Sequence, residues 1–341
     1  MANGKTGRRG TRKPVAEQKL LTGIAQGVAR AVTQPMASTP PKKPKKSGKK
    51  NGGTGRGHVA CMDAFNPAHL PLPRAVAPYL VVRTTRVFEP PSNAGLSLFG
   101  PMYHRSAGNW SNAMVMSTRL NYTTSTIGDV DNWSLGAFAS MASGAWSAAT
   151  ATPSAFSMQI MNPTNLQNAS GTLFAGRVKN KFNLSDMVLS QTVEGVANNL
   201  VAFTTPRIIA AGKLSLRGVQ IDAVPNNMNA LSDFTPVYLA TEGNTTMGTS
   251  FEPLFDGFNP LFVFNPDNIR YKAICTCEWR VRFDPSNPAH SAARMHKPAT
   301  ENMWADTINA MVAAGNGVVD IVERVANSGL PAAAARAAGY L

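Results

Sequence analysis

Apolar and polar residues alternate along the last part of the central region, 271–283. Every second position in this run is apolar: Ala273, Cys275, Cys277, Trp279, Val281 and Phe283. A period of two places successive side chains on opposite faces of an extended chain. We therefore expect a long β-strand here, with one buried face and one face in water.

Seven further runs also have extended character. The first, Tyr79–Phe88, lies between Pro78 and Pro90, and such flanking residues are typical of strand ends. The other six runs are 113–120, 156–161, 172–182, 207–219, 237–241 and 261–264. Eight strands without alternating helices predict an all-β fold: a single eight-stranded antiparallel jelly-roll sandwich that spans 58–285.

The pattern changes after Pro285. Residues 286–299 have the composition of a polar linker, and beyond them apolar residues recur at alternating gaps of four and three, which is the spacing of one helix face. This face comprises Trp304, Ile308, Met311, Gly315, Val318, Val322 and Val325. We expect an amphipathic helix and an Ala-rich tail within 300–341. The apolar face either packs on the sandwich or a neighbouring subunit, or leaves the body to bind a membrane.

Charge adds a cationic N-terminal arm to this picture. Residues 1–57 contain 14 of the 33 Lys and Arg and one acid, Glu17, so they carry +13 of the formal net charge of +14. Their Gly-, Pro- and Lys-rich composition predicts disorder, with a short helix over 15–32 that forms on a partner. Neutralising phosphates releases counterions, so we expect a nucleic-acid partner; a solubility tail or a nuclear-import signal is the alternative.

The residues expected to bind nucleic acid are the bases that cluster in this arm. They are Arg8, Arg9, Arg12, Lys13, Lys42, Lys43, Lys45, Lys46, Lys49, Lys50 and Arg56.

The remaining composition argues against several classes of protein. Three cysteines do not provide a disulfide framework and fit a reducing compartment. We expect neither a membrane span nor a secretory signal, because long apolar runs are absent from the sequence and its basic N-terminal segment has no apolar core behind it. Cys275 and Cys277 with His290 and His296 lack the turn that most structural zinc sites use, and phosphate-loop, nucleophile-elbow and zincin motifs are absent from the sequence. We do not expect a conventional enzyme.

A cationic arm, a Ser/Thr/Asn-rich sandwich and a C-terminal amphipathic helix, in this order, resemble the coat proteins of small icosahedral single-stranded RNA viruses. The layout is similar to that of nodaviruses, and the sandwich is similar to that of tombusvirus-like coats. The matching segments are Asp63–Pro67, Leu70–Pro73, Ser170–Arg177 and Tyr271–Phe283.

This resemblance implies a capsid protein of the virion that is assembled in the host cytoplasm. It implies 180 copies in a quasi-equivalent T=3 shell, with single-stranded RNA packaged by the arm and a host membrane as a partner during cell invasion. Similar coats also enclose single-stranded DNA, so the type of genome stays open. The alternative functions are a non-assembling RNA-binding β-sandwich with a basic tail and a carbohydrate-binding jelly roll.

The same resemblance implies two sites. Calcium often bridges subunits in this family, and Asp129 and Asp131 offer carboxylates two residues apart in an expected loop; a solvated turn is the alternative. Nodavirus-like coats also cut themselves once at an Asn-Ala bond, which corresponds here to Asn309-Ala310 with Asp63 as the acid. Asn309, however, falls inside the predicted helix, whereas the family's bond precedes it.

Overall fold

Two β-sheets form the framework of the chain. The computed structural model describes residues 60–66, 69–74, 76–91, 94–104, 108–111, 113–117, 133–137, 149–179, 192–238, 243–245, 253–255, 257–313, 315 and 317–321. These residues belong to the unit Asn51–Leu341, and the preceding unit, Met1–Lys50, lies outside them. Within the described residues one sheet has nine strands and the other has seven. The predicted all-β class is confirmed.

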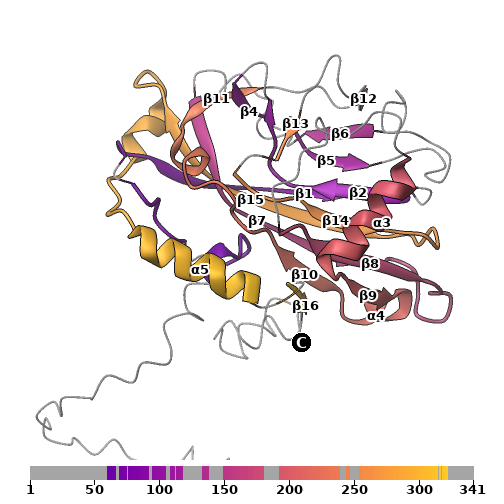
Figure 1. The fold of residues 1–341 in the computed structure, drawn as a ribbon. Helices are drawn as coiled ribbons and strands as arrows, with labels where there is room; N and C mark the ends of the chain where they lie inside the picture. Colours follow the sequence, from indigo (N-terminus) through magenta and orange to yellow (C-terminus); the bar gives the residue numbers. More distant parts are fainter. Residues whose placement is uncertain are drawn as a thin grey trace, which may run out of the picture. The chain divides into compact units, whose positions relative to one another are not determined.

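Eight of these strands follow the jelly-roll order. Neighbours in the first sheet are, in order, β1 (Leu80–Phe88), β15 (Lys272–Phe283), β7 (Ala149–Met161) and β10 (Val219–Asp222). Neighbours in the second sheet are β2 (Leu96–Phe99), β14 (Leu261–Phe264), β8 (Thr172–Arg177) and β9 (Arg207–Ala210). Every one of these pairs is antiparallel, and strands far apart in sequence, such as β1 and β15, lie side by side (Figure 1). This order is the double Greek key of a jelly roll.

Two insertions supply most of the other strands. The first, between β2 and β7, contributes β3 (Tyr103–His104), β4 (Asn109–Ser111), β5 (Ala113–Ser117) and β6 (Trp133–Ala137). The second, between β10 and β14, contributes η4 (Ala230–Ser232), β11 (Thr235–Tyr238), β12 (Gly243–Thr245) and β13 (Pro253–Leu254). The insertions pair with each other: β4 runs parallel to β11, while β3–β13 and β6–β12 are antiparallel. They therefore extend both sheets beyond the jelly roll.

β15 is buried on both of its faces. Its apolar side is completely buried from Ala273 to Val281, as the alternation predicts, and it packs in the main core. The opposite side was expected in water, and this expectation is wrong: Thr276, Glu278 and Arg280 are 2%, 1% and 0% exposed. We call this second side of the first sheet its outer face.

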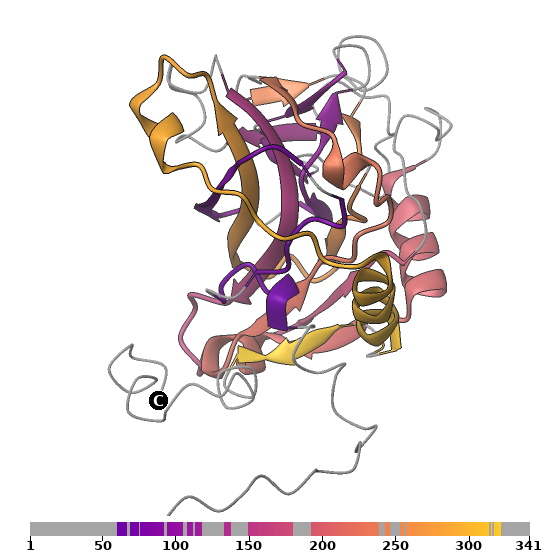
Figure 2. The same cartoon turned by 90° about the vertical axis from the view of Figure 1, so that its left-hand side faces the viewer.

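Segments from both ends of the described chain cover the outer face (Figure 2). They are η1 (Ala60–Met62), residues 69–79, η5 (Pro288–Ala292), residues 294–299 and α5 (Glu301–Ala313). We call 69–79 the N-terminal strap and 294–299 the C-terminal strap. Tyr79 and Arg294 exchange two backbone hydrogen bonds of 3.1 and 3.2 Å, and the Ala299 N–H donates to the Leu72 carbonyl at 3.0 Å. The two straps therefore form one paired layer.

Two helices interrupt the region between β8 and β10. Residues 207–219, predicted as one strand, form β9, then α4 (Ala211–Leu216), then β10. Ala211 and Leu214 are buried at helical spacing, and Gly218 ends the turn with a φ of 59°, so the single-strand prediction is wrong. The other helix, α3 (Val193–Thr204), was not predicted; the Thr192 side chain caps it by accepting from the Gly195 N–H at 3.2 Å.

Candidate functional site

Several residues singled out from the sequence lie outside the described residues. They are the arm 1–57 with all its named bases and its expected helix 15–32, the calcium candidates Asp129 and Asp131, and Val322 and Val325 of the expected membrane face. Their roles stay predictions.

α5 packs its apolar face on the body. Trp304 and Met311 are buried in the main core, and half-buried Ile308 packs against it. The Trp304 indole Nε1–H donates to the Pro71 carbonyl oxygen at 2.9 Å, which ties the helix to the N-terminal strap. Of the helices in the described residues, none is both long and apolar enough to cross a membrane.

The helix is shorter than the sequence pattern predicts. α5 ends at Ala313, and Gly315 and Gly317 follow with φ angles of 74° and 73°. Val318 then begins strand β16 (Val318–Asp320), which pairs with β10 at the edge of the first sheet. The assignment of Val318 to the apolar helix face is therefore wrong, because two left-handed glycines break the helix.

Four cationic side chains hold this C-terminal segment in place. The Arg177 Nη2 donates to the Gly315 carbonyl at 3.3 Å, and the Arg207 Nη1 donates to the Val318 carbonyl at 3.1 Å. The buried Asp320 carboxylate lies 3.2 Å from Arg207, 3.0 Å from Lys213 and 3.9 Å from Arg217. One buried carboxylate thus faces three cations, so this edge of the body keeps an excess of positive charge. No pattern in the sequence predicted this cluster.

A second buried ionic cluster lies beneath the straps. Glu278 pairs with Arg280 at 3.0 Å and with Arg83, and its Oε1 accepts from the Ser154 hydroxyl at 3.0 Å. Arg280 in turn donates to the Leu70 carbonyl at 2.8 Å. Glu278 and Arg280 lie on the polar side of the alternating pattern in β15, as do Lys272, Thr276 and Arg282, so no local signal in the sequence marked this pair as buried.

Aromatic and imidazole rings close the space above Arg280. The Arg280 guanidinium lies 5.6 Å from the centroid of the Tyr79 ring, and the His296 ring stacks on Tyr79 with a centroid separation of 4.2 Å. The His69 ring meets His296 edge-on at 5.8 Å. Burial first, and then the charge of Arg280, lower the pKa of His69.

Asp63 and Asn309 occupy different surroundings. Asp63 is buried, and its Oδ1 accepts from the Phe65 N–H at 3.0 Å in a turn just after η1. Asn309 is exposed in α5, where the backbone carbonyls bond to N–H groups four residues on. Self-cleavage at Asn309-Ala310 stays a prediction that requires this turn of the helix to open.

The three cysteines lie apart from any metal-binding set. Burial raises the pKa of the Cys275 and Cys277 thiols well above the ordinary value, and the two point into the core between the sheets, whereas His296 lies above the outer face. Among the described residues, His, Cys, Asp and Glu do not gather in a group of three or more that fits a metal ion.

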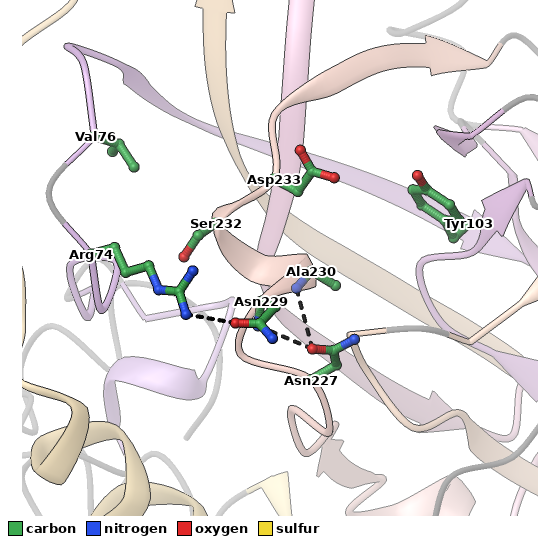
Figure 3. Close-up of a pocket in the computed structure, with 8 residues that line it drawn as sticks. All are labelled: Arg74, Val76, Tyr103, Asn227, Asn229, Ala230, Ser232 and Asp233. Atoms are coloured by element: carbon green, nitrogen blue, oxygen red, sulfur yellow. Dashed lines mark hydrogen bonds between the residues drawn. The ribbon is translucent and has the colours of Figure 1, made fainter.

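A polar recess of about 530 Å³ opens between the N-terminal strap and the second insertion (Figure 3). Arg74 reaches from the strap and donates to the Asn229 Oδ1 at 2.7 Å. The Asn227 Oδ1 accepts from the N–H groups of Asn229 and Ala230 at 3.0 and 3.3 Å. Arg74, Asn227 and Asn229 thus hydrogen-bond to each other and to the backbone of the turn. These bonds give the side chains a structural role in holding the loop that lines the recess.

Comparison with known proteins gives structural neighbours alone. No protein-family model and no curated protein sequence matches the chain. T=1 particles derived from infectious bursal virus are similar at 9% identity and a TM-score of 0.42, covering 80% of this chain and 95% of that chain. The Gx strain structure of infectious bursal disease virus is similar at 8% identity and a TM-score of 0.43, covering 77% of this chain and 94% of that chain. The 60-mer BFDV capsid protein is similar at 11% identity and a TM-score of 0.26, covering 62% of this chain and 97% of that chain.

Similarity at this level does not assign a family or a function to the chain. The all-β class rests on the two sheets described above, and the nodavirus-like or tombusvirus-like resemblance stays a prediction.

Proposed function

We propose that this chain is a capsid protein that self-assembles into an icosahedral shell and packages a genome through its N-terminal arm. A jelly roll by itself does not define a function, so the proposal rests on how charge is distributed around it. Nearly all of the net charge lies in 1–57, ahead of a body that is almost neutral. A structural role of this kind needs no catalytic centre.

The observation that carries the proposal is that both ends of the described chain lie on one side of the sandwich. Just after η1, the Ala64 N–H donates to the Ser157 hydroxyl of β7 at 2.9 Å, and β16 pairs with β10, the neighbour of β7. Asp320 of β16 is the carboxylate at the centre of the Arg207–Lys213–Arg217 cluster. In the proposed capsid, the surplus charge of this cluster would add to that of 1–57 in neutralising nucleic acid.

Electron microscopy of the expressed full-length chain tests assembly. We expect uniform closed shells with nucleic acid inside, as judged by the absorbance ratio of purified particles. Deletion of 1–57 removes +13 of the charge and is expected to give shells that lack nucleic acid or vary in size. Monodisperse full-length monomers would refute the proposal and favour the non-assembling RNA-binding alternative.

The finer features form part of the same proposal. It has 180 copies in a T=3 shell, single-stranded RNA inside, assembly in the host cytoplasm, and calcium held between subunits by Asp129 and Asp131. Two carboxylates provide only part of the six to eight oxygens that calcium takes, so the other ligands have to come from Asp186 or from a neighbouring subunit. A chelator near neutral pH should swell wild-type shells but leave Asp129→Asn, Asp131→Asn shells unchanged; equal responses would return these residues to a solvated turn.

A role for α5 at a membrane also belongs to the proposal. Within the described residues, the apolar face of α5, which we call its seam, comprises Trp304, Ile308 and Met311. Because this seam is packed on the body, membrane binding requires α5 to detach first. Self-cleavage at Asn309-Ala310 is checked by intact-mass measurement of assembled particles. Persistence of the full-length chain in mature particles would exclude it.

A further inference from the structure

The two straps meet at a pair of histidines above a buried arginine. His69 belongs to the N-terminal strap and His296 to the C-terminal strap, and their rings are in edge-on contact at 5.8 Å. His296 also stacks on Tyr79, whose other neighbour is the Arg280 guanidinium. Both imidazoles are half-buried, so protons from the solvent reach them.

The charges around this pair are already mostly positive. Arg280 and Arg83 share the single carboxylate of Glu278, and the Arg282 guanidinium lies 3.7 Å from the Phe234 ring centroid at the margin of the straps. Arg280 is fully buried, and its Nε and Nη1 have no hydrogen-bond partner among the described residues. A further cation placed here is repelled by positive charge that Glu278 compensates only in part.

We propose that His69 and His296 form an acid-sensitive clasp, which holds the straps on the outer face near neutral pH and opens when protonation of His69 places another cation beside Arg280 and His296. The clasp is a property of the folded chain and does not depend on assembly.

The direction of the pH effect follows from the surroundings of His69. Burial, Arg280, His296 and Arg83 lower its pKa, and Glu278 opposes them. A histidine whose pKa is lower in the folded state is held in its neutral form by folding. The stabilisation is therefore fully present above the unfolded value of about 6.5 and is lost as the pH falls through it towards the folded value.

Opening of the clasp loosens α5. The straps are also joined by the two Tyr79–Arg294 backbone bonds at one end and by the Ala299–Leu72 backbone bond at the end nearer α5, and α5 is joined to the N-terminal strap by the Trp304–Pro71 bond. Separation of the straps at the end nearer α5 breaks the Ala299–Leu72 and Trp304–Pro71 bonds and uncovers the apolar side chains of Trp304 and Met311. If the proposed function holds, acid would thus convert the packed helix into a membrane-binding one, which is a consequence that rests on that function.

Hydrogen exchange of the full-length protein, at about pH 7.5 and about pH 5 and corrected for intrinsic rates, tests the clasp directly. We expect amides of 69–72 and 296–304 to exchange several-fold faster at the lower pH, while amides of 273–281 in β15 remain protected. His69→Gln keeps a neutral polar side chain and should abolish the acceleration.

The matched control is His290→Gln. His290 is exposed, and its Nδ1 lies 2.9 Å from the Phe283 carbonyl oxygen outside the clasp, so this variant should retain the wild-type pH response. Equal acceleration in His69→Gln and wild type, or no acceleration in wild type, would overturn the proposal. A variant that exchanges fast at both pH values would also overturn it, because His69 would then be a packing residue only. None of these readouts requires shells to form, so failure of the clasp is distinguishable from failure of the capsid proposal.

Discussion

Glu278 is a single residue on which the stability of the fold at the outer face of the first sheet depends. The carboxylate is 1% exposed and compensates two guanidinium groups, Arg83 and Arg280. Its removal leaves Arg280 as a buried cation without a counter-charge, whereas an exposed ion pair is screened by water. The position of a charge thus matters more than the number of its partners.

We predict that Glu278→Gln lowers the free energy of unfolding by about 3–5 kcal/mol, the usual cost of breaking a buried ion pair by removing one partner. Urea denaturation measures this change. Glu89→Gln is the matched control, because Glu89 is an exposed carboxylate with two cationic partners, Arg270 and Lys272, and should change stability little. Equal effects of the two substitutions would contradict the assignment of a buried network to Glu278.

The cysteines give a second test at the residue scale. Burial raises the pKa of Cys275 and Cys277, and it raises that of half-buried Cys61 as well. Because the thiolate is the reactive form, we predict that iodoacetamide labels Cys275 and Cys277 only on unfolding. Cys61 should react in the native protein, but more slowly than a fully exposed cysteine thiol. Mass spectrometry of labelled peptides checks this order, which native labelling of Cys277 would contradict.

At the scale of elements, alternation predicted β15 and its apolar residues correctly but not the environment of its polar side. Period-two alternation reports which residues share a face, and it does not report what covers that face. The straps and α5 that bury Thr276 and Glu278 come from segments roughly 200 residues earlier or 20 residues later in the sequence. Long-range cover of this kind has no local signal.

The helices show the complementary limit. α3 carried its signal in the sequence, since Val193, Val196, Ala197 and Leu200 are buried at helical spacing behind the Thr192 cap, yet it was not predicted. In contrast, the apolar spacing of α5 continues through Gly315 to Val318, but the backbone turns into β16. Two features outweigh the helical periodicity there. One is the conformational freedom of the two glycines, and the other is the set of cations around 315–320, which we call the cationic clamp: Arg177, Arg207, Lys213 and Arg217.

The two glycines make this junction testable. Both have positive φ angles, but a Cβ on Gly317 would lie 2.8 Å from the buried Arg177 guanidinium, whereas a Cβ on Gly315 meets nothing within 4 Å. Each Ala substitution should cost roughly 1 kcal/mol for its backbone conformation. Gly317→Ala should in addition detach β16, which amide exchange at 318–320 reports; equal exchange in the two variants would contradict the clamp.

At the scale of the whole molecule, the arm and the body differ in net charge. The arm carries +13 and the rest of the chain about +1, so affinity for nucleic acid should depend on salt mainly through the arm. Phosphate contacts of this kind carry no sequence information. The body adds the surplus charge around Asp320.

We predict that replacing Lys42, Lys43, Lys45, Lys46, Lys49 and Lys50 with Gln weakens binding to all RNA sequences alike. The slope of log affinity against log salt should fall by about 0.7 for each phosphate of a single strand that the arm no longer neutralises. Fluorescence anisotropy with two unrelated oligonucleotides measures both quantities. A sequence-dependent decrease in affinity with an unchanged slope would show that the arm reads bases.

The pairing of β1 with β15 delays formation of the first sheet until late in the synthesis of the chain. Leu80 lies opposite Val281 in the register of these strands, so the first sheet lacks its second strand until ribosomes have translated nearly the whole chain. Synthesis proceeds from the N-terminus at about 5–20 residues per second, and non-local pairing of this kind folds slowly. The cationic arm therefore leaves the ribosome, within reach of nucleic acid, well before the sandwich behind it closes.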